Sequence, residues 1–378
     1  NMSNQHLEIV PSNITSDGTL SYKNGQPTIQ LLIGAQDRFI VPGSVRLCGN
    51  LTIKKNNTII PLETDEIRMN ERLGVHSVID TLSIFSQRAC HAYETSLRFP
   101  NYKAQQLGVI TNSQGASASG GDSPNSFCIP LVSGLFLGQE PIPLSNDWGV
   151  GGLLVEIQLS PDQNVLFSGD NTDTNLLDAY YELSNVRLIC EVQRPGDDFV
   201  PQSTNTFTYN SISSYYNTIN SRNAVLNFNL GLKSVLGAFA NVVPSAHINS
   251  WTRDGLATLG FSNSDASRAQ VNQLVFTRAG QRVPLEYNID TLQKDEVPGF
   301  DNETGDAQIV RNYMNAVQNW GFGVAYDSIS NQGLDFAQVP FGVALDVELT
   351  SDHPNAVFLF VHARQTIVSS NNSIQVMK

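Results

Sequence analysis

Two eight-residue segments of this chain resemble each other across half of its length. Gly152–Leu159 reads GLLVEIQL and Gly342–Leu349 reads GVALDVEL, and the two lie 190 residues apart in a chain of 378. In both, apolar residues alternate with other residues and a polar turn follows, which is typical of a half-buried strand. A repeat at about half the chain length favours two copies of one fold. The sequence therefore predicts a duplicated β-domain.

A second pair of segments matches at a different offset. Asn185–Val192 (NVRLICEV) resembles Ala356–Ala363 (AVFLFVHA). An insertion at Ser168–Tyr180 in the first half would account for both offsets. Duplication remains the better interpretation, although similar Val- and Leu-rich strands can also arise independently.

Short apolar or alternating runs recur along the chain between residues that favour turns. The 28 Gly and 17 Pro residues are typical of many short strands joined by turns. A change of phase near Gly49–Asn50 predicts a β-bulge. Three short helices are also predicted, at Ser86–Leu107, Leu232–Phe239 and Gly305–Gln318, and the first of them is broken at Pro100. The expected strands are Thr28–Ile33, Ser44–Lys54, Val78–Phe85, Phe127–Val132, Gly152–Leu159, Asn185–Gln193, Ala224–Leu230, Asn272–Thr277, Gly342–Leu349 and Ala356–Val368.

These elements predict an all-β fold with a few short helices, built as two tandem eight-stranded jelly-roll β-sandwiches. The strongest break in the middle of the chain is Pro195–Asp198. The predicted organisation is an N-terminal arm at residues 1–25, a first jelly roll at 26–198, a second at 199–368 and a C-terminal tail at 369–378.

The histidines and acidic residues form no recognisable metal motif. None of the six histidines pairs with another at a spacing of two or four residues. His91 and Glu94 lie one turn apart on an expected helix, and we interpret them as a surface contact rather than a metal pair. Gly169–Asn175 (GDNTDTN) lacks the residue order of a calcium loop. We therefore expect no metal and no cofactor.

Catalytic patterns are equally weak. Gly115–Gly121 (GASASGG) lacks the spacing of a nucleophile elbow. Glu156 and Asp346 occupy equivalent strands of different domains, so we expect them to face solvent rather than one cleft. The three tryptophans are dispersed, which favours packing in a core or an interface over a sugar platform, and they are Trp148, Trp251 and Trp320. The sequence predicts no catalytic residue and a protein that is not an enzyme.

The four cysteines all lie in the first half of the chain, and no two of them are close in sequence. They are Cys48, Cys90, Cys128 and Cys190. A disulfide framework is improbable in a chain of this length. We expect buried free thiols.

The charge distribution bears on partners and location. The net charge is −13, and Lys23 is the one basic residue of the first 25. We therefore expect no direct, extensive binding of nucleic acid. The N-terminal residues lack the pattern of a signal peptide, which favours synthesis inside a cell without secretion by such a peptide. Glycosylation stays open at the sequons beginning at Asn13, Asn50, Asn56, Asn302 and Asn371.

Three segments resemble a known protein family. Tyr181–Glu191 (YELSNVRLICE) is similar to the last strand of the first roll in double jelly-roll major capsid proteins. Tyr215–Phe239 is similar to the entry into their second roll, and Asn355–Thr366 (NAVFLFVHARQT) is similar to their closing strand. Within that lineage the chain looks most like the capsid proteins of Polinton-like viruses and virophages.

The resemblance implies a structural protein of the virion capsid. It implies a homotrimer of pseudo-hexameric shape that tiles an icosahedral shell and contacts neighbouring capsomers, penton proteins and minor capsid proteins. The arm and the tail would lie inside, and the loops Thr111–Asn125 and Lys294–Asp306 would lie outside. The host, genome type, triangulation number, receptor and any contact with an internal membrane stay open.

Two other classes compete with this interpretation. A carbohydrate-binding or adhesive β-sandwich protein predicts a secretion signal and clustered aromatic residues. A jelly-roll enzyme, such as a glycosidase or a cupin, predicts paired carboxylates or metal ligands within one domain. Neither pattern is present in the sequence.

Overall fold

The computed structural model describes the chain in thirteen ranges, and its strands fall into two compact units. Unit 1 comprises Asn1–Pro100, Asn112–Ile212 and Arg364–Lys378, and unit 2 comprises Asn101–Thr111 and Ser213–Ala363. The predicted domain borders at residues 25, 198 and 368 remain predictions. The described residues are 4–13, 22–23, 28–59, 67–69, 74–88, 92–96, 125–168, 178–244, 270–283, 322–326, 330–348, 355–370 and 373–378.

One sheet of unit 1 has the strand order β10-β3-β13-β4-β5, with β1 added beside β13 and β9 beside β4. Its paired strands are antiparallel. The bounds are β1 Gln5–Ile9, β3 Phe39–Ile40, β4 Arg46–Lys55, β5 Thr58–Ile59, β9 Asn125–Pro130, β10 Ile142–Pro143 and β13 Ala179–Gln193.

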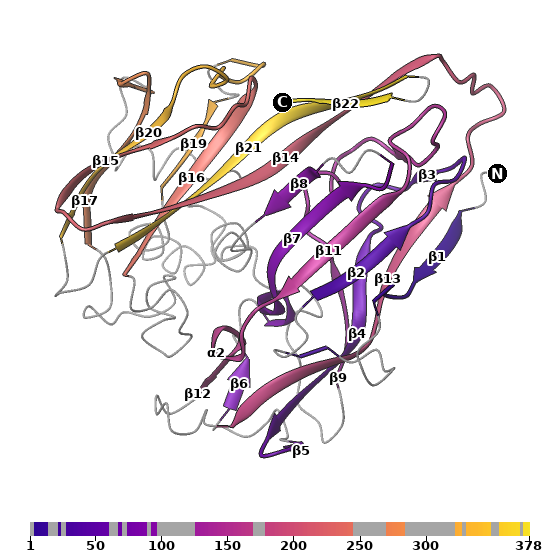
Figure 1. Cartoon of the computed structure of the whole chain (residues 1–378), viewed down its shortest axis with the longest axis horizontal. Helices are drawn as coiled ribbons and strands as arrows, with labels where there is room; N and C mark the ends of the chain where they lie inside the picture. Colours follow the sequence, from indigo (N-terminus) through magenta and orange to yellow (C-terminus); the bar gives the residue numbers. More distant parts are fainter. Residues whose placement is uncertain are drawn as a thin grey trace, which may run out of the picture. The chain divides into compact units, whose positions relative to one another are not determined.

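A second sheet of unit 1 has the order β2-β11-β7-β8, and β14 follows β8 (Figure 1). β22 pairs with the end of β21 in the same unit. Four short elements complete unit 1. They are β6 Ile67–Met69, the 3-10 helix η1 Gly74–Val78, the helix α2 Asp162–Val165 and β12 Leu166–Ser168. The strand bounds are β2 Thr28–Ile33, β7 Ile79–Ser86, β8 Ala92–Ser96, β11 Leu153–Leu159, β14 Thr204–Ile219, β21 Asn355–Ser370 and β22 Ser373–Met377.

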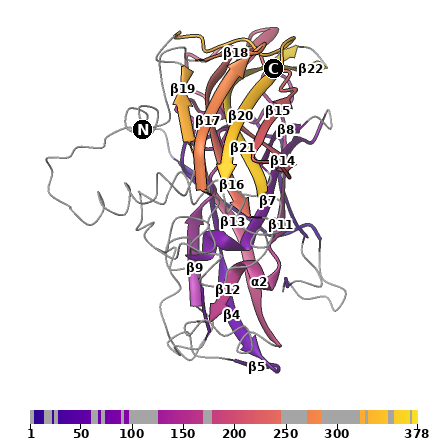
Figure 2. The ribbon, with the colours of Figure 1, turned by 90° about the vertical axis from the view of Figure 1, so that its left-hand side faces the viewer.

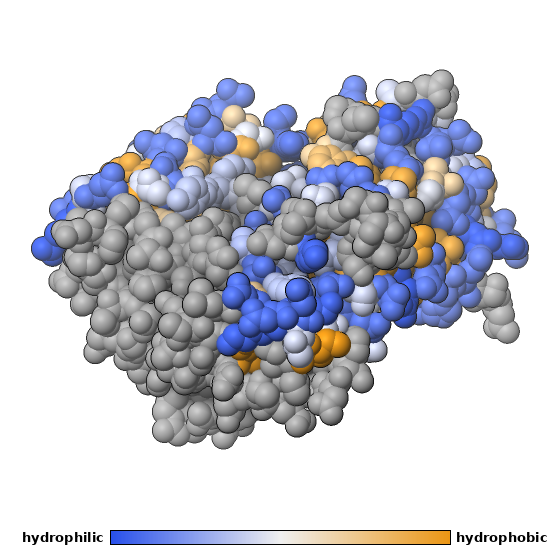
Figure 3. Space-filling view, turned by 60° about the horizontal axis from the view of Figure 1, so that its bottom comes forward, coloured by the Kyte–Doolittle hydropathy of each residue, from blue (hydrophilic) through white to orange (hydrophobic). Residues whose placement is uncertain are grey.

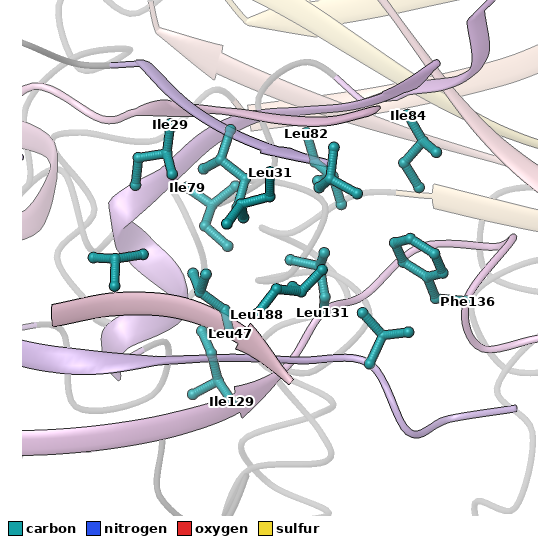
Figure 4. Packing of buried hydrophobic residues seen from close by; sticks show 14 of the residues in the cluster. Ile29, Leu31, Leu47, Ile79, Leu82, Ile84, Ile129, Leu131, Phe136 and Leu188 are labelled. Atoms are coloured by element: carbon teal, nitrogen blue, oxygen red, sulfur yellow. The ribbon is translucent and has the colours of Figure 1, made fainter. Parts of the chain in front are cut away.

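The core of unit 1 lies between these two sheets. Every second residue of β11 is buried, because successive side chains of a strand point to opposite faces. Figure 4 shows Leu31 and Leu82 of one sheet opposite Leu47 and Leu188 of the other. Side chains from both layers therefore form one sandwich core.

Unit 2 repeats the two-layer plan. One sheet has the order β15-β20-β17-β18, and β17 and β20 are seen side by side in Figure 2. In the other, β16 lies between β19 and the first part of β21. Buried residues of both sheets share one cluster, including Phe276, Val343, Ala238 and Leu359. The bounds are β15 Asn223–Phe228, β16 Val235–Pro244, β17 Gln270–Arg278, β18 Gln281–Arg282, β19 Phe322–Ala325 and β20 Phe341–Glu348.

The all-β prediction is confirmed, and all ten predicted strand segments contain strands of the structure. The repeated segments form β11 and β20, which both lie between two neighbours in their sheets. The predicted arm contains β1, which pairs along β13 from Gln5–Val192 to Ile9–Leu188.

Two of the predicted helices are wrong. Within Ser86–Leu107, residues 92–96 form β8, which pairs with β7. Within Leu232–Phe239, the chain enters β16, which pairs on both sides. Cross-strand pairing in the sheet overrides the local helical spacing in both places. The predicted helix Gly305–Gln318 lies outside the described residues.

The predicted bulge is present, but the extra residue belongs to the neighbouring strand. The register of β13 against β4 jumps from Ser184–Asn50 to Arg187–Cys48, which leaves Asn185 and Val186 opposite Gly49. Asn185 adopts a positive φ of 52°, a conformation that asparagine tolerates better than most residues. The irregularity read at Gly49–Asn50 therefore marks a bulge in β13.

None of the helices in the described ranges is long and apolar enough to cross a membrane.

Candidate assembly surfaces

Most residues singled out for chemistry are separated by the fold. Glu156 lies on β11 of unit 1, where its carboxylate accepts a hydrogen bond from Gln30 Nε2 at 3.0 Å. Asp346 lies on β20 of unit 2 and pairs with Arg222 Nε at 3.0 Å. They do not form a carboxylate pair within one unit, as predicted. His91, Trp251, Trp320, Gly115–Gly121 and Gly169–Asn175 lie outside the described residues.

Glu94 is not a surface residue, which corrects the prediction of a helical surface contact with His91. It lies on β8, and only 4% of its surface is exposed. One carboxylate oxygen accepts the N–H of Gly134 at 3.0 Å and the other accepts that of Leu135 at 3.2 Å. The side chain therefore fastens the turn after β9 to β8.

The surroundings of Glu94 disfavour its charge. Burial raises the pKa of Glu94 to about 7, although the hydrogen bonds from Gly134 and Leu135 and the contact with Ser133 lower it. The Tyr209 hydroxyl nearby donates to the Tyr93 carbonyl at 2.6 Å and contacts Gln365 Oε1 at 3.1 Å. Burial and the neighbouring Glu94 raise the pKa of Tyr209. These contacts are all internal, which indicates a structural role for the carboxyl group.

The described residues contain no group of three or more His, Cys, Asp or Glu side chains placed to bind a metal ion. Cys48, Cys128 and Cys190 are free thiols. Cys48 and Cys190 are buried as predicted, whereas Cys128 is exposed. The prediction of burial is wrong for Cys128, which lies on the outer face of β9, an edge strand in the described residues. Cys90 lies outside the described residues.

One apolar group at the surface of unit 1 is an aromatic cluster of Phe39, Trp148 and Phe199, here called the Phe199 patch together with the adjacent exposed residue Val200. The Trp148 ring lies 5.1 Å from that of Phe39 and 4.7 Å from that of Phe199, measured between centroids. Trp148 is 7% exposed, Phe199 37% and Val200 77%. The prediction that Trp148 serves packing rather than a sugar platform agrees with this enclosure.

The Phe199 patch is held by the segment between β13 and β14. The N–H of Phe199 donates to the carbonyl of Gly196 at 2.9 Å, which closes a turn directly after the break at Pro195. The sequence indicated only a break at Pro195–Asp198 in this region. The available signal was an apolar pair, Phe199-Val200, directly after Asp197 and Asp198.

Two strands at sheet ends also carry exposed apolar side chains. Within the described part of the chain, β2 ends one sheet of unit 1 and β15 ends one sheet of unit 2. Leu32 on β2 is 39% exposed and Val225 on β15 is 66% exposed. On the face shown in Figure 3, hydrophobic residues form small groups among hydrophilic ones. Exposed apolar groups are features of surfaces that associate.

Solved structures show what fold this is. The capsid of the virus PBCV-1 matches 100% of this chain and 97% of its own chain, with a TM-score of 0.62 and 9% identity. A chain of the Sputnik virophage matches 99% and 88%, with a TM-score of 0.62 and 11% identity. The mavirus major capsid protein matches 98% and 90%, with a TM-score of 0.55 and 11% identity. No protein-family model and no curated protein sequence matches the chain. The chain therefore has the double jelly-roll fold of these proteins, as the sequence predicted.

Proposed function

We propose that this chain is a viral major capsid protein with a structural rather than an enzymatic role. The observation that carries the proposal is the match of almost the entire chain to almost the entire length of the PBCV-1 capsid chain, the Sputnik virophage chain and the mavirus major capsid protein. Fold by itself does not fix function. Here the likeness agrees with low charge and with the absence of catalytic patterns in the sequence.

The working form in this proposal is a homotrimer. Three chains with two jelly rolls each give six similar bodies around a threefold axis, and such a pseudo-hexamer tiles an icosahedral shell. The proposed organisation keeps an arm at residues 1–25, rolls at 26–198 and 199–368, and a tail at 369–378. Neighbouring capsomers, penton proteins and minor capsid proteins are the proposed partners, and the virion capsid is the proposed location.

The proposed shell protein does not bind the genome extensively. The chain carries 35 acidic against 22 basic residues. Lys23 is the one Lys or Arg among the first 25 residues. Glu8 forms an ion pair with Arg187 Nε at 3.2 Å, which holds β1 against its own sheet. An acidic chain of this kind repels the phosphate backbone.

Light scattering of the purified chain tests the trimer. A chain of 41.3 kDa predicts a particle of three times that mass. Electron microscopy of the same sample should then show hexagonal tiles. A stable monomer at micromolar concentration that binds glycans would instead indicate a carbohydrate-binding β-sandwich and overturn the proposal.

A further inference from the structure

Two thiols of unit 1 face each other across neighbouring strands. Cys48 on β4 and Cys128 on β9 are direct partners in the antiparallel register. Residues directly opposite each other in such a pair project from the same face of the sheet. The preceding pair, Leu47 and Ile129, is fully buried in the core. Because side chains alternate along a strand, the two cysteines lie on the outer face.

The spacing of this pair suits a covalent bond. Directly opposite residues of antiparallel strands have Cα atoms about 4.5 Å or about 5.5 Å apart, depending on the type of pair. Disulfides span Cα separations of about 4.4–6.8 Å. Either type of pair therefore fits without separating the strands.

The two sulfur atoms also differ in access. Cys48 is 3% exposed, whereas Cys128 is exposed. Burial raises the pKa of the Cys48 thiol to about 12, and a side-chain hydrogen bond with Cys128 adds to the rise. The third free cysteine of the described residues, Cys190, is buried on β13 opposite Leu7 of β1. Among these three described thiols, Cys128 is thus the one that a reagent in solution can reach.

We propose that Cys48 and Cys128 form an oxidisable dithiol, which closes to a cross-strand disulfide on reaction with a small-molecule disulfide. The thiolate of Cys128 attacks one sulfur of the reagent, forms a mixed disulfide and expels one thiolate. Cys48 then loses its proton to solvent and attacks Cys128 Sγ, which expels the second thiol. Two protein thiols are oxidised, and one small disulfide is reduced to two thiols.

The bond fastens an edge of the sheet. In the described residues β9 pairs with β4 alone, so β9 is an edge strand. A disulfide between residues 48 and 128 closes a loop of about 80 residues, and cross-links of long loops restrict the unfolded chain most. The site therefore controls how firmly β9 is held. This inference does not depend on the proposed capsid function.

The test uses the full chain, first reduced and then incubated with oxidised glutathione at pH 8. After free thiols are blocked, peptide mapping by mass spectrometry should find Cys48 linked to Cys128. The melting temperature of the oxidised protein should exceed that of the reduced protein by roughly 5–10 °C. Closure should accelerate between pH 7 and pH 9, because only the Cys48 thiolate resolves the mixed disulfide.

Two variants serve as matched controls. Cys190→Ser keeps the pair and should form the same disulfide with a similar rise in melting temperature. Cys128→Ser changes an exposed residue and should melt like reduced wild type, with no rise after treatment with oxidised glutathione. The proposal is overturned if wild type accumulates a persistent glutathione adduct at Cys128, stays unmodified, or links Cys48 or Cys128 to another cysteine.

Discussion

At the scale of single residues, the turn after β9 depends on two residues whose roles the local sequence does not reveal. Gly134 lies so close to β14 that a Cβ atom there would be 1.7 Å from the carbonyl oxygen of Asn210. Glu94 holds the same turn through the N–H groups of Gly134 and Leu135. The roles of both residues therefore depend on how β8 and β14 pack against this turn.

Gly134→Ala should destabilise unit 1. The atoms in the way belong to the backbone of Asn210, so no side chain can rotate aside and the strands must shift. Overpacking of this kind costs about 1–3 kcal/mol of unfolding free energy. Urea denaturation measures it. The matched control is Gly34→Ala, because no heavy atom lies within 4 Å of a Cβ at Gly34, and equal stability of the two variants would contradict the expectation.

Glu94 should make the protein less stable as the pH rises. Its folded-state pKa of about 7 lies above the ordinary value of 4.5, so the folded protein binds this proton more tightly than the unfolded chain. The stabilisation by this proton is complete below about pH 4.5, falls between there and pH 7, and is absent above. The full loss is at most about 3 kcal/mol of unfolding free energy.

Glu94→Gln tests this dependence, because glutamine cannot ionise. The unfolding free energy of wild type minus that of the variant should fall between pH 5 and pH 8. Glu156→Gln is the control, because it removes a carboxyl group from β11 but keeps Glu94. Its unfolding free energy minus that of Glu94→Gln should therefore show the same fall between pH 5 and pH 8. A wild-type-minus-Glu94→Gln difference that stays constant over this range would refute the assignment.

At the scale of elements, the strands are longer than the alternation of their sequences indicates. In β13 the buried residues are Tyr181 and Leu183 before the bulge, then Val186, Leu188, Cys190 and Val192 after it. The extra residue changes the parity of the pattern. Alternation alone therefore predicts a strand that begins at Asn185, whereas the real one begins at Ala179.

Asn185→Val should destabilise this bulge. Asn185 has a φ of 52° and an exposed side chain, so the change acts on the backbone rather than on packing. A β-branched residue in the left-handed region costs about 1–2 kcal/mol of unfolding free energy. Asn185→Gly is the control and should lie within about 0.5 kcal/mol of wild type. Chemical denaturation measures both, and a fully stable Asn185→Val variant would show that the bulge relaxes freely.

At the scale of the whole molecule, the proposed trimer needs surfaces that associate, and the Phe199 patch is a candidate for one of them. It combines a partly exposed aromatic ring with the 77% exposed Val200. Patches with exposed aromatic and aliphatic groups mark interaction sites more often than isolated apolar residues do.

Val200→Asp should weaken self-association and leave folding intact. The new charge would have to be desolvated in an interface, whereas an exposed position in the free chain tolerates it. Gln202→Asp is the matched control, since it adds the same charge to an exposed position of the same segment. Light scattering over a concentration series should show more dissociation for Val200→Asp alone. Equal dissociation of both variants, or of neither, would exclude the Phe199 patch from the interface.

The sequence by itself determined the all-β class, the positions of ten strands and the repeat of β11 in β20, because the two-residue period of a half-buried strand is visible in the local sequence. It also placed Glu156 and Asp346 in different units. The helix predictions at β8 and β16 were wrong because short apolar runs fit both the helical period of 3.6 residues and the strand period of two. Pairing with the neighbouring strands selected the strand conformation.

Only the tertiary structure decided which distant residues meet. The pairing of Cys48 with Cys128, the burial of Glu94 beneath the turn at Gly134, and the contact of Trp148 with Phe199 each join residues some 40 to 80 positions apart. Strand order and register fix such contacts, and neither is encoded in the local alternation of a single strand.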